Sequence, residues 1–227
     1  MIVSQHRQPV GVAERIEKRM RTVKAAEERR KEILDVAEQM FAEKGFDHAS
    51  TNDIIGRIGI ARGTLYHHFD SKEAILDALV ERLTREAIQR ARLIVANQSI
   101  PLLERLSRTV LALNIHSQAA PELFRQIHRP QNALLHQKMQ ELLLGGVVPL
   151  IASLIEEGNE TGLFAAKYPA EAAEMIMMYS SLAFDELAGF SPDQAERKIR
   201  AFIHHIERML EAKEGCLETT IRKMFRS

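Results

Sequence analysis

The sequence predicts an all-α protein, with a small N-terminal group of three helices followed by a larger helical domain. Apolar residues recur at the 3.6-residue period of an amphipathic helix along most of the chain, and glycine or proline stands at the ends of these stretches. We find no convincing strand and no internal repeat. With 227 residues, of which 45% are hydrophobic and 27% charged, the chain is long enough for one large or two small globular domains.

The first predicted helix covers residues 27–44 and ends at Gly45, which tolerates the positive φ of a helix C-terminus. One stripe of this helix is apolar and consists of Ile33, Val36, Ala37, Met40 and Phe41. Residues 15–31, which overlap the start of this helix, contain eight basic and three acidic side chains. Such a run attracts polyanions, although a solvated helix face gives the same pattern. We expect residues 1–24 to form a basic arm, which is either loose and bound in the minor groove or an extension of the helix; a start of the protein within this stretch is a further alternative.

Two short helices follow, separated by a tight turn at Gly59. Ser50 and Asp53 have the spacing of a capping box at the start of the first, and Leu65 and Phe69 share the buried face of the second. Asp70 or Ser71 can cap the next helix, whose buried stripe is Ile75, Leu76, Leu79, Val80 and Leu83. Residues 50–69 therefore have the layout of a helix-turn-helix, whose second helix enters the DNA major groove.

The polar residues of this motif are candidates for DNA contacts. Arg62 can read guanine or bind a phosphate, Thr64 can contact a thymine methyl group, and Gly63 lets the backbone approach the duplex. Lys72, one turn later, is expected to bind a backbone phosphate. The candidate DNA-binding residues are Thr51, Arg62, Gly63, Thr64, Tyr66, His67, His68 and Lys72.

Residues 27–80 resemble the N-terminal DNA-binding domain of the tetracycline-repressor (TetR) family of bacterial transcriptional regulators. The most specific part is the block from Gly63 to Phe69, followed by Ser71-Lys72-Glu73. Further matching positions are Ala37, Phe41, Gly45, Phe46, Thr51, Ile54, Gly59 and Ile60. The sequence departs from the family pattern in the extension before residue 25 and at Gly56, which should destabilise its helix by about 1 kcal/mol relative to alanine.

The resemblance implies a homodimeric repressor whose C-terminal domain binds a small-molecule effector. The two DNA-reading helices must then fit successive major grooves of a palindromic operator, about 34 Å apart or a multiple of that, so that small rotations release the DNA. It also implies a DNA-binding domain over residues 25–72 and a ligand-binding and dimerisation domain over residues 73–227.

Beyond Ala96 the pattern predicts longer helices with short breaks. The expected ranges are 102–118, a short helix from Pro121, a long apolar helix over 130–158, and two closing helices over 169–189 and 192–212. Ser191 and Pro192 form the start of the last. Gly145, Gly146 and Pro149 should kink or loosen the long helix, and the glycine pair could open space inside the domain or mark a hinge.

By the same resemblance, the two closing helices would pair with their copies in a four-helix bundle. Candidate interface residues, each of which could instead belong to the intramolecular core, are Met175, Tyr179, Leu182, Ile199, Ile203, Ile206 and Leu210. Candidate effector-pocket residues, whose methionines suit varied apolar ligands but also a plain core, are His116, Phe124, His128, Met139, Met178 and Phe184.

Other classes of function find little support. The single cysteine, Cys216, excludes an internal disulfide and fits a reducing compartment. No signal-peptide core and no uninterrupted run of 18 apolar residues occurs, so we expect a cytoplasmic protein without a membrane partner. The histidine pairs 67–68 and 204–205 are adjacent, so each pair diverges on its helix and predicts no metal site. No catalytic motif or cofactor-binding loop is present.

Three hypotheses follow. The favoured one is a dimeric repressor released by a ligand. The second is an all-helical small-molecule binder or enzyme in which the N-terminal motif is a protein-interaction surface. The third is a DNA-bound regulator without a ligand.

Overall fold

The computed structural model describes residues 10–113, 126–183 and 190–224, and every regular element within these ranges is a helix. The predicted all-α fold class is therefore confirmed. The chain divides into two compact units, Met1–Leu79 and Val80–Ser227. The division falls beyond the predicted boundary at residue 72, because the buried Ile75, Leu76 and Leu79 belong to the first unit.

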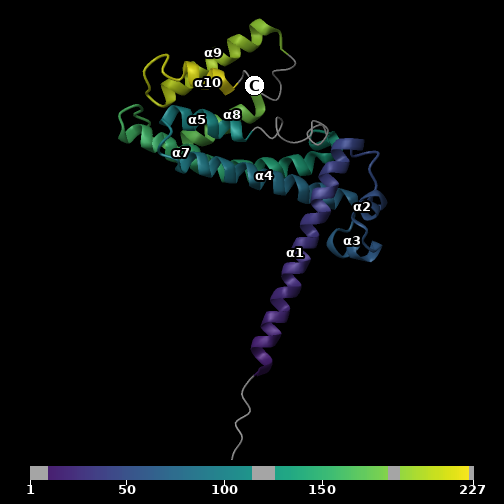
Figure 1. Cartoon of the computed structure of the whole chain (residues 1–227). Coiled ribbons are helices and arrows are strands. Elements are labelled where there is room, and N and C mark those ends of the chain that lie inside the picture. The colour runs from purple at the N-terminus through teal and green to yellow at the C-terminus, as the bar shows by residue number, and fades with distance from the viewer. Residues whose placement is uncertain (1–9, 114–125, 184–189, 225–227) are drawn as a thin grey trace, which may run out of the picture. The chain divides into compact units, whose positions relative to one another are not determined.

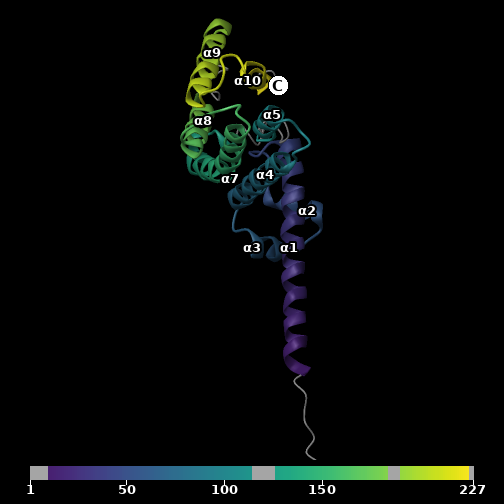
Figure 2. The ribbon, with the colours of Figure 1, turned by 90° about the vertical axis from the view of Figure 1, so that its left-hand side faces the viewer.

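The first unit contains α1 (Val10–Lys44), α2 (Thr51–Ile58), α3 (Arg62–His68) and the start of α4 (Lys72–Ala96). The predicted apolar stripe of α1 is buried except for the half-buried Val36, and Gly45 ends the helix with φ 80°. Figures 1 and 2 show α1 continuing well past α2 and α3. The expected basic arm is thus helical from Val10, since no proline occurs in this stretch and alanine, glutamate, lysine and arginine favour a helix.

The second unit contains the rest of α4 and six further described elements. These are α5 (Leu102–Ala112), the short 3-10 helix η2 (Pro130–Asn132), α7 (Ala133–Glu160), α8 (Pro169–Ala183), α9 (Pro192–Met209) and α10 (Glu218–Met224). Its apolar core joins α4, α7, α8, α9 and α10. Sequence reasoning missed α10, which packs against α5. The predicted helix at Pro121 and the ends of two others, residues 114–118 and 184–189, lie outside the described residues.

The long helix α7 is continuous through Gly145, Gly146 and Pro149, so these residues do not end it; a kink at these positions stays a prediction. The stretch Pro130–Glu160 is long and apolar enough, by length and composition alone, to cross a membrane. However, Val147, Ile151 and Ile155 are buried in the core of the second unit. We therefore interpret α7 as a core helix.

The two adjacent glycines of α7 differ in their surroundings. A Cβ added to Gly146 would lie 2.6 Å from Cδ1 of the buried Ile88, whereas one added to Gly145 would meet nothing within 4 Å. Gly146 therefore allows α7 to approach α4 closely, and Gly145 has no such role.

We expect Gly145→Ala to stabilise the protein by about 1 kcal/mol, the difference in helix propensity between the two residues. Gly146→Ala gains the same propensity but forces Ile88 to move, and overpacking of this kind costs about 1–3 kcal/mol. Urea denaturation of the two variants at one protein concentration measures the difference. Equal stabilisation by both substitutions would contradict the close packing of α4 on α7.

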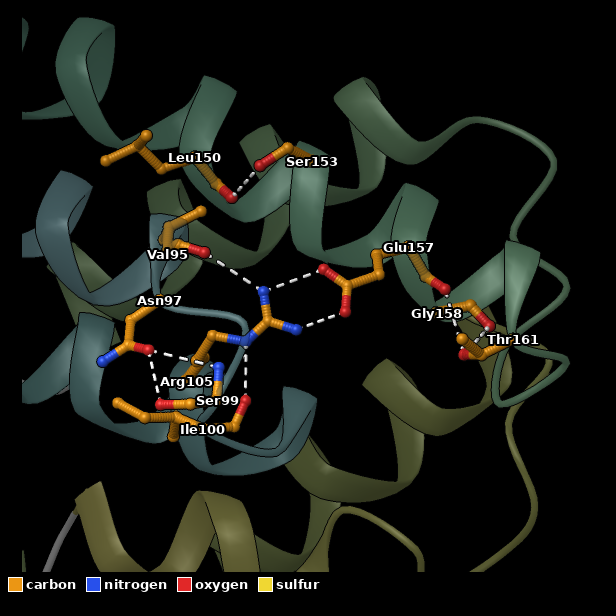
Figure 3. Close-up of polar contacts among 10 residues, drawn as sticks. All are labelled: Val95, Asn97, Ser99, Ile100, Arg105, Leu150, Ser153, Glu157, Gly158 and Thr161. Carbon is orange, nitrogen blue, oxygen red and sulfur yellow. Dashed lines mark hydrogen bonds and ion pairs between the residues drawn. The ribbon is translucent and has the colours of Figure 1, made fainter.

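A buried ion pair joins three segments of the second unit. Figure 3 shows the Arg105 side chain of α5 pointing at Glu157 of α7. Its guanidinium also donates to the carbonyls of Val95 (3.1 Å), at the end of α4, and Ile100 (3.0 Å), in the connection to α5. Arg105 is only 3% exposed. This one side chain therefore fixes the end of α4 and the following turn against α7.

Candidate nucleic-acid interface

The start of α2 is held by the predicted capping box. The Ser50 hydroxyl accepts from the Asp53 amide (3.1 Å), and the Asp53 carboxylate accepts from the Ser50 amide (2.9 Å). Lys44, at the end of α1, donates to the same carboxylate (3.0 Å). The hydrogen bond from the Ser50 side chain, followed by that from Lys44, lowers the pKa of Asp53 to about 2. The carboxylate is thus ionised at neutral pH, and α2 is joined to the end of α1.

The turn at Gly59 then directs α3. Gly59 has φ 76°, and its amide donates to the Ile55 carbonyl (2.9 Å). Leu65 is fully buried and Phe69 is 3% exposed, as predicted. The opposite side of α3 is accessible: Arg62, Gly63, Tyr66 and His67 are exposed, while Thr64 and His68 are half-buried.

Three of the predicted DNA-binding residues meet on this surface. The hydroxyl groups of Thr51 on α2 and Tyr66 on α3 lie 3.3 Å apart, and the Arg62 guanidinium lies 5.4 Å from the Tyr66 ring centroid. Hydrogen bonding to Thr51, and then to Arg62, lowers the pKa of the Tyr66 hydroxyl. We call the exposed residues Arg62, Gly63, Tyr66 and His67, together with Thr51, the reading surface.

Arg30 of α1 fixes the C-terminal end of α3. Its guanidinium donates to the His68 carbonyl (3.1 Å) and lies 4.2 Å from the centroid of the Phe69 ring. Burial, followed by electrostatic interactions with His67, Arg30 and Arg29, lowers the pKa of His68. Sequence reasoning placed Arg30 only in a basic run, because its partners lie 38 and 39 residues further along the chain and leave no local signal.

Lys72 has a different environment from the one expected of a phosphate contact. Its ammonium donates to the carbonyls of Phe46 (2.8 Å) and Ala49 (3.0 Å) and lies 4.3 Å from the centroid of the Phe46 ring. The side chain is half-buried. It therefore holds the connection between α1 and α2 against the start of α4.

We expect Lys72→Met to lower the free energy of unfolding by about 2–4 kcal/mol, because two charge-assisted hydrogen bonds are lost and two carbonyls are left unpaired. The salt dependence of DNA binding should stay unchanged, whereas losing a phosphate contact would reduce the slope of log K against log salt by about 1. Urea denaturation and titrations at several salt concentrations measure both quantities, with the exposed Lys31→Met as the control. A reduced slope at unchanged stability would restore the phosphate role.

The predicted interface residues of α8 and α9 separate into two groups. Met175 and Tyr179 are 59% and 49% exposed, and Ile199 is half-buried. The side chain of Leu182 lies outside the described residues. By contrast, Ile203, Ile206 and Leu210 are buried in the core of this same chain. The helical period that predicted them marks a buried face without saying which element covers it.

The structure describes three of the six predicted pocket residues. His116, Phe124 and Phe184 lie outside the described residues. His128 is paired with His136, their ring centroids 4.6 Å apart, while Met178 is 49% exposed and Met139 half-buried. A cleft of about 410 Å³ lies instead between α4 and α7. Its lining residues are Arg85, Ile88, Gln89, Arg92, Glu141, Leu142, Gly145 and Gly146. Of these residues, only Gly145 and Gly146 were expected from the sequence to border an open space in the domain.

Comparison with known proteins identifies both units. The sequence profile of bacterial regulatory proteins of the TetR family matches residues 33–79, and that of a tetracycline-repressor-like C-terminal domain matches residues 116–204. The transcriptional repressor KstR2 of Rhodococcus jostii is 42% identical over 69 residues, which are 30% of this chain and 34% of that protein. The regulator UidR of Escherichia coli is 42% identical over 67 residues, or 30% and 34% of the two chains. These alignments thus span about a third of the relatives' length.

Solved structures share the fold over most of the chain. A TetR-family regulator from Pectobacterium atrosepticum superimposes with a TM-score of 0.59 at 24% identity, covering 82% of this chain and 94% of the other. RolR in complex with resorcinol gives a TM-score of 0.57 at 19% identity, covering 90% and 97%. The profile over residues 33–79 therefore agrees with the helix-turn-helix described above, and the profile over residues 116–204 and both structures agree with the helical fold of the chain. The chain belongs to the TetR family of bacterial transcriptional regulators, which are not enzymes.

Proposed function

We propose that this protein is a homodimeric, sequence-specific transcriptional repressor that a small-molecule ligand releases from its operator. The observation that carries the proposal is the reading surface. Its polar side chains on α3 are exposed and Thr51 at the start of α2 is half-buried, while Leu65 and Phe69 anchor the other side of α3. A helix held in this way can enter a major groove without rearrangement of the domain.

The reading surface offers the chemistry that base edges require. Arg62 presents a guanidinium that can bind guanine with two hydrogen bonds, and Tyr66 and His67 add donors for base edges or phosphates. Gly63 is exposed and has open space around its Cα, so the backbone can lie close to the duplex. Three basic residues stabilise the motif. Arg30 donates to the end of α3, Lys44 to Asp53 of α2, and Lys72 to the connection between α1 and α2.

Support for a homodimer comes from α8. Met175, Met178 and Tyr179 are 59%, 49% and 49% exposed and occupy positions i, i+3 and i+4 of this helix. Large apolar side chains gathered on one helix face are typical of an interface between proteins. A second copy of the chain is the partner that a palindromic operator requires, because two-fold symmetry of the protein matches that of the DNA.

Support for repression and for a ligand comes from the comparisons. KstR2, which is 42% identical over 69 residues, is a transcriptional repressor. RolR, which shares the fold, holds resorcinol in its solved structure. We infer the same organisation here, with DNA read by the first unit and a ligand bound by the second, in the cytoplasm where the DNA is.

Selection of binding sites from a random DNA pool at near-physiological salt tests the proposal. We expect the purified protein to recover a palindromic sequence with half-sites about 34 Å, or a multiple of that, apart. Recovery of no motif by the folded protein would contradict sequence-specific regulation. Recovery of an asymmetric motif would contradict the homodimer.

A further inference from the structure

We infer that the cleft between α4 and α7 binds a small monocarboxylate with an apolar body. Both helices belong to the second unit at this point, and they run side by side in Figures 1 and 2. The cleft measures about 410 Å³, a size that suits small organic ligands. None of its lining residues has a role in the reading surface or in the core contact of Arg105.

The first observation is that Gly145 has no packing reason to be glycine. A glycine inside a helix costs about 1 kcal/mol relative to alanine. The neighbouring Gly146 is explained by the contact with Ile88, but a Cβ on Gly145 would enter open space in the cleft. A residue that lowers helix stability without allowing a packing contact in return is typical of a functional site. Gly145 is exposed and lines the α7 side of the cleft without a side chain.

The second observation is a pair of uncommitted donors on the α4 side. Gln89 and Arg92 stand at positions i and i+3, and within the described residues neither has a hydrogen bond or an ion pair. Arg85 differs, because it already donates to Glu81 through Nε (3.0 Å) and a terminal nitrogen (2.7 Å). A planar guanidinium without a partner is suited to binding a carboxylate through two parallel hydrogen bonds. Arg92 is therefore the expected anchor for an anion, assisted by Gln89.

The remaining lining residues determine which other chemical groups the ligand can have. Ile88 and Leu142 are apolar and suit a hydrocarbon or aromatic body. Glu141, on α7, accepts from Gln137 (2.8 Å) and adds a negative charge to the other side of the cleft. A second anionic group on the ligand would be repelled by this carboxylate. One carboxylate on an apolar body is thus the ligand that matches the cleft.

The consequence for regulation rests on the proposed function. α4 is one continuous helix from Lys72 to Ala96, so a ligand bound at residues 85–92 contacts the same helix whose first residue holds the connection between α1 and α2. Binding in the cleft can therefore act on the DNA-binding unit through a single element.

Calorimetric titration with two pairs of probes tests the inference without DNA. Octanoate is compared with 1-octanol, and phenylacetate with 2-phenylethanol. We expect at least one carboxylate to bind the full-length protein at least tenfold more tightly than its neutral analogue. Arg92→Gln should remove this preference, and Gly145→Leu, which fills the cleft, should abolish binding. Binding should be unchanged in Arg197→Gln and Ser153→Leu, which make matched changes at exposed positions outside the cleft.

The inference is overturned if neither carboxylate is preferred, or if Gly145→Leu binds as the unchanged protein does. A separate titration then adds the bound carboxylate to the complex with the selected DNA. We expect it to weaken DNA binding at least tenfold, and to do so no longer in Gly145→Leu. Carboxylate binding without DNA release would leave the site in place and contradict ligand control, so the two failures are distinguishable.

Discussion

Replacing both Arg62 and Tyr66 by alanine is expected to weaken binding to the selected operator at least 100-fold while the protein stays folded. Each base or phosphate contact of this kind contributes about 1–3 kcal/mol, and about 1.4 kcal/mol corresponds to a tenfold change in affinity. The fold should survive because both side chains are exposed and contact mainly each other and Thr51. Fluorescence anisotropy with labelled operator DNA measures the loss, and circular dichroism checks the fold.

The matched control is Arg197→Ala combined with Tyr168→Ala, two exposed residues of the same types in the second unit. Its DNA affinity should equal that of the unchanged protein. The single variant Arg62→Ala then separates two roles. Relaxed specificity at one base position would show that Arg62 reads guanine, whereas equal weakening on all sequences with a lower salt slope would show a phosphate contact. Unchanged affinity in the double variant would mean that α3 does not read the DNA.

The parts of this structure that the sequence predicts well depend on neighbouring residues. The capping box of Ser50 and Asp53, the positive φ of Gly59, and the inward spacing of Leu65 and Phe69 are set within a few residues of the chain. The helix-turn-helix is built almost entirely from such local signals. Its position and its exposed polar face could therefore be predicted from the residues alone.

The parts that were missed depend on partners far away in the sequence. The contacts of Lys72 with the carbonyls of Phe46 and Ala49, and of Arg30 with His68, join residues 23 to 38 positions apart. The apolar stripe of α9 predicts that a face is buried, and in the structure Ile203 and Ile206 of this face pack in the core of the second unit. Periodicity reports burial and leaves the covering element undetermined. The two glycines of α7 are ambiguous in the same way. As adjacent glycines inside a predicted helix, Gly145 and Gly146 cannot be told apart by sequence, but only Gly146 packs against another helix.

Arg105→Ala is expected to lower the free energy of unfolding by about 3 kcal/mol or more. The substitution leaves the Glu157 carboxylate without its partner and the carbonyls of Val95 and Ile100 without a donor. Removing one member of a buried ion pair typically costs about 3–5 kcal/mol, because the other charge stays desolvated. Glu157 retains 32% exposure of its side chain, which places the expectation at the lower end of that range.

A double variant measures how much of that loss in stability comes from the unpaired Glu157 carboxylate. Arg105→Met combined with Glu157→Leu removes both charges and keeps apolar volume, so it should be more stable than Arg105→Met alone. It should not reach the stability of the unchanged protein, because the two carbonyls remain unpaired. Arg108→Met is the control, since its exposed pair with Glu104 contributes little. Urea denaturation at one protein concentration ranks the four proteins. If the double variant were no more stable than the single one, packing of the Arg105 side chain, and not its charge, would hold α4 and α5 to α7.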